Sequence, residues 1–127
     1  MKIRLFVLLS LLVMVALALV ACGGGAAPAP ASAKGDAAKG KTTFVGTCSA
    51  CHGPDAKGLP GLGKDLTGST FVKGQTDDQL LAFLKVGRPA NDPANTTKVD
   101  MPPKGGNPAL TEKDLQDVIA FIRTVNK

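Results

Sequence analysis

The chain has 127 residues, which is the length of one domain rather than of several. It carries 15 Lys and Arg against 10 Asp and Glu, a formal net charge of +5. It has no basic run with interleaved aromatic residues, so nucleic-acid binding is not expected. With no Trp, no Tyr and five Phe, so small a domain has a marginal core of its own, and a bulky apolar cofactor would complete it.

The N-terminus is typical of a secretory signal. Basic residues at Lys2 and Arg4 precede a long apolar run. The run ends in Leu19-Val20-Ala21-Cys22, which resembles the bacterial lipoprotein signal, in which the cysteine becomes the lipid-modified first residue of the mature chain. An uncleaved transmembrane anchor is the alternative, although the run is barely long enough. We expect a signal peptide at 1–21 and lipidation at Cys22.

A linker and one domain follow the signal. Residues 22–35 are almost all Gly, Ala, Pro and Ser after the cysteine, which is linker composition. The domain is therefore expected at 36–127. Removal of the signal leaves 13 basic and 10 acidic residues, a net charge of +3. A lipid anchor or an uncleaved helix would each hold this domain outside the cytoplasm, on a bacterial membrane.

The domain is predicted to open with a helix. Asp36 is suited to its N-cap, and good helix formers follow as far as Val45 or Gly46. Gly40 lies inside this helix at a cost of about 1 kcal/mol relative to alanine, which a close helix crossing would explain. The cysteines that follow are expected just past the helix end.

The pentapeptide Cys48-Ser49-Ala50-Cys51-His52 has the C-x-x-C-H spacing of a covalent attachment site for haem c. Each of two thiols can form a thioether with a haem vinyl group, and the adjacent imidazole then lies beneath the iron. A thioredoxin-like redox pair would need a strand-helix-strand context, which is absent from the pattern. A zinc site would need four ligands, and only one further cysteine exists. A disulfide across two residues would stabilise very little.

The segment after the motif reads as a loop. Residues 53–68 are rich in Gly, Pro and Asp, and Leu59, Leu62 and Leu66 are expected to face inward.

Two further helices have clear start signals. Thr76 and Gln79 form a predicted capping box for a helix over 77–86, which Gly87 should end. Thr111 is the predicted N-cap of the last helix, whose apolar residues recur at helical spacing on one face: Leu115, Val118, Ile119, Ile122 and Val125.

A loop over 87–110 separates these helices and carries Met101. It has no periodicity and is longer than an unstructured loop in a compact domain should be without a function. Haem iron bound by His52 takes a sixth ligand or keeps an open site, and the chain has no second histidine. Met101 is the predicted ligand; a core-filling role for it, ligation by a lysine, and an open site are the alternatives.

These motifs together resemble a small bacterial monohaem cytochrome c of the class I type, over residues 36–127. The resemblance implies an all-α fold of about three to four helices around one covalent haem c, with His52 and Met101 as axial ligands. It also implies that the terminal helices cross near Gly40, where Phe44 would meet Phe121. The family often has G-P-x-L after the motif, whose proline carbonyl binds the axial histidine. This chain has Gly63-Lys64-Asp65-Leu66 instead, so the carbonyl is expected from Lys64 or from nearby Pro60.

The resulting functional hypothesis is a membrane-tethered one-electron carrier that is not an enzyme and has no small-molecule substrate. Its expected partners are redox proteins: a quinol-oxidising complex, a terminal oxidase, a photosynthetic reaction centre or a dehydrogenase. A haem-bearing relay subunit of a dehydrogenase or oxidase complex is the second hypothesis. Gas sensing or peroxidase activity would need an open iron position. A rim of lysines around the haem crevice is either a docking face or an ordinary solvated surface: Lys57, Lys64, Lys73 and Lys104.

Overall fold

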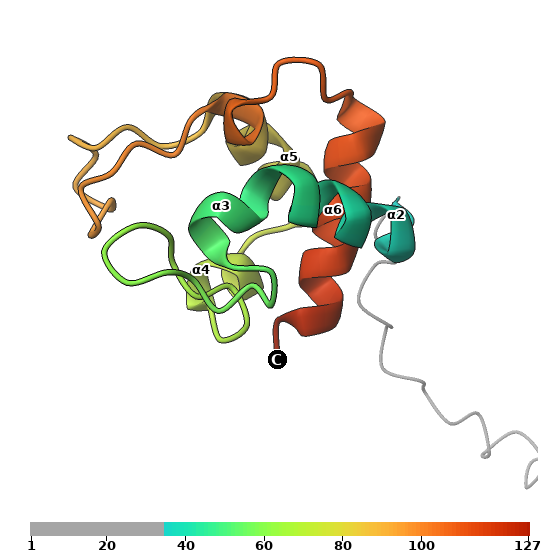
Figure 1. The fold of residues 1–127 in the computed structure, drawn as a ribbon, viewed down its shortest axis with the longest axis horizontal. Helices are drawn as coiled ribbons and strands as arrows, with labels where there is room; N and C mark the ends of the chain where they lie inside the picture. The colour runs from blue at the N-terminus through green and yellow to red at the C-terminus, as the bar shows by residue number, and fades with distance from the viewer. Residues whose placement is uncertain (1–34) are drawn as a thin grey trace, which may run out of the picture. The chain divides into compact units, whose positions relative to one another are not determined.

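The computed structural model describes residues 35–127 (Figure 1). The signal peptide expected at 1–21, the lipidation site Cys22 and the linker up to residue 34 lie outside the described residues. The regular structure of the described part is helical, with two isolated bridges and no strand, which confirms the all-α class. None of its helices is long and apolar enough to cross a membrane.

Three helical segments follow one another without a break at the start of the domain (Figure 1). They are α2 (Ala37–Thr43), the π-helical turn η1 (Phe44–Cys48) and α3 (Ser49–His52). The carboxylate of Asp36 accepts hydrogen bonds from two backbone amides of the first turn of α2, at 2.9 and 3.2 Å. The predicted N-cap is therefore confirmed.

The predicted end of this helix is wrong. The cysteines lie within the helical run rather than beyond it, and the first glycine with a positive φ in this region is Gly53, at 72°. Gly46 instead keeps its place in η1, where the amide of Ser49 reaches the carbonyl of Phe44 five residues back. A glycine ends a helix only when it leaves the helical conformation, and the wider turn absorbs Gly46 without such a change.

The N-terminal run crosses α6 (Glu112–Val125) at Gly40 (Figure 1). A Cβ atom at Gly40 would overlap the backbone carbonyl of Asp117. One turn later the rings of Phe44 and Phe121 meet with their centroids 5.2 Å apart. The expected close crossing and the expected ring contact are thus both present, and only a residue without a side chain permits this approach.

The apolar face of α6 forms much of the core. Thr111 and Asp114 make the capping box at its start, each accepting a hydrogen bond from the backbone amide of the other. Four residues of the predicted face are buried: Leu115, Val118, Ile119 and Ile122. The fifth, Val125, is partly buried and packs against them. Its amphipathic pattern stabilises the helix by packing rather than by propensity alone.

Helix α5 (Asp77–Val86) has the predicted bounds and the predicted capping box between Thr76 and Gln79. Gly87 ends it with a φ of 75°. The sequence pattern does not reveal α4 (Thr70–Gly74), because a helix of five residues is too short for a periodic apolar face. Counting the N-terminal run as one, residues 35–127 contain four α-helical segments, in line with the three to four expected.

The predicted loop over 53–68 is present, but its three leucines differ in how far they are buried. Leu66 packs against the core. Leu62 is 36% exposed but lines the central cavity of the domain. Leu59 is 39% exposed and lines neither the core nor that cavity, so for Leu59 the expectation is wrong. Leu59 lies in a tight turn, where its amide bonds to the carbonyl of Gly63; such turns lie on the surface because their backbone groups need water.

Candidate cofactor site

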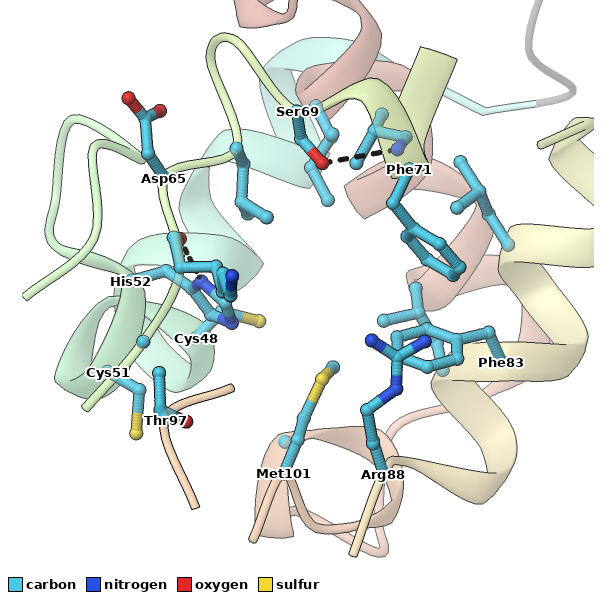
Figure 2. Close-up of a pocket in the computed structure, with 18 of the residues that line it drawn as sticks. Cys48, Cys51, His52, Asp65, Ser69, Phe71, Phe83, Arg88, Thr97 and Met101 are labelled. Carbon is cyan, nitrogen blue, oxygen red and sulfur yellow. Dashed lines mark hydrogen bonds between the residues drawn. The ribbon is translucent and has the colours of Figure 1, made fainter. Parts of the chain in front are cut away.

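A cavity of about 720 Å³ lies at the centre of the domain. It falls within the roughly 300–1,000 Å³ of small-molecule and cofactor sites. Figure 2 shows His52 on one side of this space and Met101, Phe71 and Phe83 on the other. The four residues predicted from the sequence all line it: Cys48, Cys51, His52 and Met101.

The two cysteines come from the last turn of η1 and from α3, and both are free thiols. Burial raises the pKa of the Cys48 thiol to about 11, and the neighbouring Cys51 adds to the rise. A reactive C-x-x-C pair needs the opposite shift, toward a low thiolate pKa. Cys48 therefore does not have the lowered pKa of a reactive thiol.

A zinc site is also not formed in this part of the chain. Within residues 35–127 no three Cys, His, Asp or Glu side chains are grouped to hold a metal ion. Structural zinc needs four such ligands.

His52 ends α3 and is fixed by one hydrogen bond. Its Nδ1 lies 2.8 Å from the backbone carbonyl oxygen of Lys64. Because a carbonyl only accepts, this contact assigns the proton to Nδ1 and leaves Nε2 with a free lone pair. A bond of this kind sets the tautomer and ring orientation of a metal-ligating histidine. Of the two carbonyls considered from the sequence, that of Lys64 makes the bond.

Glycine makes this bond possible. A Cβ atom at Gly63 would overlap the backbone carbonyl of Cys51. The loop can therefore lie directly against the attachment motif, which brings the next carbonyl to the imidazole.

Met101 reaches the cavity from a different part of the chain. Its amide donates to the carbonyl of Arg88 and its carbonyl accepts from the amide of Arg88, both at 2.8 Å. Two residues that exchange both hydrogen bonds in an antiparallel bridge place their side chains on the same side. In Figure 2 both side chains point into the cavity.

The loop between these two residues is organised by Asn95, which is 6% exposed. Its Nδ2 donates to the carbonyls of Pro89 and Val99, at 3.0 and 2.7 Å. Its Oδ1 accepts from Thr97 Oγ1 and from the amide of Lys98, both at 3.0 Å. One side chain thus joins both ends and the turn of the loop that carries Met101.

Sequence reasoning missed Arg88 and Asn95. An Asn between prolines is a signal for a turn, but nothing local distinguishes Asn95 from the exposed Asn91. The roles of these side chains depend on groups that only the folded loop brings together.

The four lysines expected at the rim are not equivalent. Lys64 and Lys104 line the cavity, whereas Lys57 and Lys73 do not. The Nζ of Lys104 donates to the carbonyls of Pro108 and Leu110, at 3.2 and 2.8 Å. Two of the four expected lysines therefore line the cavity itself.

Comparison with known proteins supports a haem site. The sequence profile of the family described as cytochrome c matches residues 37–126. The chain belongs to the cytochrome c family. This cytochrome is 31% identical to cytochrome c-555 of Prosthecochloris aestuarii over 87 residues, which cover 68% of this chain and 85% of that protein. It is 29% identical to cytochrome c-555 of Chlorobaculum thiosulfatiphilum over 87 residues, covering 68% and 93%.

A larger protein is also similar. The cbb3-type cytochrome c oxidase subunit CcoP of Rhodobacter capsulatus is 27% identical over 90 residues, which are 70% of this chain but 29% of that subunit. No solved structure shows a significant match. Family membership assigns covalently bound haem c as the cofactor and haem-based electron transfer as the role of the domain.

The residues present fit that cofactor. The cavity has two free thiols and an imidazole with a free Nε2 on one wall, and a thioether on another. Its remaining surface comes largely from the apolar core, including Phe44, Leu115 and Ile119.

Proposed function

We propose that this cytochrome is a one-electron carrier in which Cys48 and Cys51 hold the haem covalently and His52 and Met101 are its axial ligands. The observation that carries the proposal is that His52 Nε2 and the Met101 thioether enter the same cavity from separate segments, with both thiols beside the imidazole. When bound, the haem supplies an Fe(II)/Fe(III) couple. The protein itself binds no small substrate and catalyses no reaction.

Different residues orient the two axial ligands and exclude water from the haem site. The carbonyl of Lys64 orients the His52 ring, and the bridge to Arg88 orients Met101. Buried side chains of α6 line the interior and exclude water. A thioether ligand favours ferrous iron, so His/Met ligation raises the reduction potential.

The test of this ligation is a Met101→Ala variant of the full chain, produced with cytochrome c maturation machinery. We expect the weak long-wavelength absorption band of iron–thioether ligation to disappear. The reduction potential should fall by a sizeable fraction of the roughly 0.8 V over which axial ligands set it. An unchanged band and potential would refute Met101 as a ligand.

We also place the carrier on the outer face of a bacterial membrane, held by a lipid on Cys22 and the linker 22–35 after cleavage of the signal at 1–21. The lipobox-like end of the signal supports this placement. Two acyl chains suffice for stable anchoring. The wild-type chain should incorporate a labelled fatty acid and a Cys22→Ser variant should not, and equal incorporation in the two would contradict the lipid anchor.

The proposed partners are redox proteins of the same membrane, because a short tether raises their effective concentration. Similarity to an oxidase subunit supports a terminal oxidase among them; quinol-oxidising complexes, reaction centres and dehydrogenases are the other candidates. The same similarity favours the second candidate, a relay subunit within an oxidase or dehydrogenase complex. Stable co-purification with such a complex would support the subunit, and reversible oxidation by a separate membrane complex would support the carrier.

A further inference from the structure

The hydrogen bond that orients His52 comes from a carbonyl in a surface loop. The Nδ1 of His52 lies 2.8 Å from the carbonyl oxygen of Lys64 (Figure 2), and Lys64 itself is exposed. Surface loops are generally the more mobile parts of a fold. A partner of this kind fixes the ring of a metal ligand, which requires that the peptide unit of the carbonyl is itself held in place. The residues that hold this loop should therefore affect the axial ligand.

The loop is fixed two residues after that carbonyl, at Leu66. The amide of Leu66 donates to the carbonyl of Ala56 at 2.8 Å, and its side chain packs against the core. The carbonyl of Leu66 accepts a hydrogen bond from Nδ2 of Asn126 at 2.6 Å. The peptide units on both sides of Leu66 are thus held by segments that are distant in the sequence.

Asp65 connects this fixed point to the carbonyl of Lys64. Its amide nitrogen belongs to the same planar peptide unit as that carbonyl. Its Oδ1 accepts hydrogen bonds from the amide and from Oγ1 of Thr67, both at 2.6 Å. A turn of this type restricts the backbone around the aspartate. The position of Leu66 is therefore passed on to the carbonyl that binds His52.

Asn126 fastens the loop to the C-terminal end of α6 (Figure 1). Besides Leu66, its Nδ2 donates to the carbonyl of Ser69, at 3.3 Å. The amide of Lys127 adds a hydrogen bond to the carbonyl of Thr67 at 2.8 Å. Because α6 is largely buried in the core, this end of the helix gives the loop a firm support.

We propose that Asn126 is a positioning residue for the axial ligand His52. By holding the carbonyl of Leu66, it keeps the carbonyl of Lys64 within hydrogen-bond reach of Nδ1. This inference rests on the proposed function, because it concerns the histidine that binds the iron. A hydrogen bond at Nδ1 raises the basicity of the ligating nitrogen, and a more basic ligand favours ferric iron. Asn126 thereby lowers the reduction potential, although it does not line the cavity.

The experiment uses the full chain with its haem attached and compares Asn126→Ala and Asn126→Leu with the control Thr124→Ala. Leucine is close in size to asparagine but has no donor, so an effect shared by both variants belongs to the hydrogen bonds. Thr124 is an exposed residue of the same helical turn, and its Oγ1 donates to the carbonyl of Phe121 at 2.7 Å. The control therefore removes a hydrogen bond that is internal to α6.

The measurements are the exchange rate of the His52 Nδ1 proton, by NMR of the ferrous protein, the reduction potential and the free energy of unfolding. We expect the proton to exchange about two- to tenfold faster in both Asn126 variants, the range that corresponds to the loss of one hydrogen bond. Their reduction potential should lie above that of the wild type. Thr124→Ala should match the wild type in both measurements, even where it lowers the free energy of unfolding.

Unchanged exchange and potential in both Asn126 variants, with only a loss of stability, would overturn the proposal, as would equal changes in the control. Failure of the proposed ligation would be seen separately, in the wild type. The ring protons of His52 would then lack the large upfield shift that a haem ring imposes on an axial ligand.

Discussion

The two walls of the haem cavity are built in opposite ways. The histidine wall comes from one continuous helical run, in which Cys48, Cys51 and His52 lie within five residues. The methionine wall comes from a loop whose two ends, Arg88 and Met101, are thirteen positions apart and pair in a two-residue bridge. The first wall takes its geometry from local helical spacing, and the second depends on long-range contacts. Substitutions in the histidine wall and in the methionine wall should therefore have different effects on the protein.

The largest effect is expected from the attachment residues. A Cys48→Ser, Cys51→Ser double variant should retain no covalently bound haem after extraction with acidified solvent. Because a domain of this size has a marginal core without its cofactor, the haem-free chain should also be largely unfolded and sensitive to protease. A haem-free variant that unfolds cooperatively and resists protease would contradict this reading of the core.

A smaller effect is expected from Asn95, whose hydrogen bonds join the two ends of the loop that forms the methionine wall. Asn95→Ala removes a buried side chain that makes four hydrogen bonds, two of them to the carbonyls of Pro89 and Val99. This loss should cost about 1–3 kcal/mol of unfolding free energy. The thioether band should weaken, and the ferrous protein should begin to bind carbon monoxide as Met101 is released. Asn91→Ala in the same loop is the matched control, since Asn91 is exposed, and it should change stability by less than about 0.5 kcal/mol. Equal effects of the two variants would show that Asn95 does not hold the loop.

A third change tests how the histidine wall is fastened to α6. Asp117 is buried; its carboxylate binds the Nζ of Lys113 and accepts from the backbone amide of Asp36 at 2.6 Å. The ammonium of Lys113 and the amide of Asp36 lower the pKa of Asp117 below its ordinary value. A carboxylate with a depressed pKa in the folded state contributes stability above its unfolded pKa, near pH 4, and loses it as the pH falls through the folded value.

Asp117→Asn should accordingly destabilise the protein by roughly 1 kcal/mol at pH 7, because hydrogen bonds to a charged acceptor are stronger than those to a neutral one. The difference between wild type and variant should shrink as the pH is lowered from about 4, where the carboxylate begins to be protonated. Denaturant unfolding of the haem-bound protein at pH 7, 4 and 3 measures it. A difference that stays constant or grows toward acid would refute the role of the charge.

The smallest effect is expected at Lys64. The bond to His52 comes from the backbone carbonyl, so Lys64→Ala should leave the His52 ring orientation and the reduction potential unchanged. It should alter stability by less than about 0.5 kcal/mol. A large change in potential would mean that the lysine charge itself acts on the haem.

Local signals accounted for most of the helical framework. Thr76 and Thr111 cap their helices as expected, and Gly40 lies at the crossing that its place inside a helix demanded. The predicted end of the first helix at Val45 or Gly46 is wrong, because the backbone keeps a helical conformation through η1 and α3. The short helix α4 was missed because five residues carry no period.

By itself, the sequence determined the haem motif, the methionine loop, the helix caps and the glycine crossing, because each depends on residue types within a few positions of one another. Only the tertiary structure decided which carbonyl fixes His52, that Asn95 closes the loop and that Arg88 points into the cavity. Each of these is a contact between segments that approach one another only when the chain folds. Their partners are backbone groups and ring faces, which many residue types can provide, so no pattern along the chain marks them in advance.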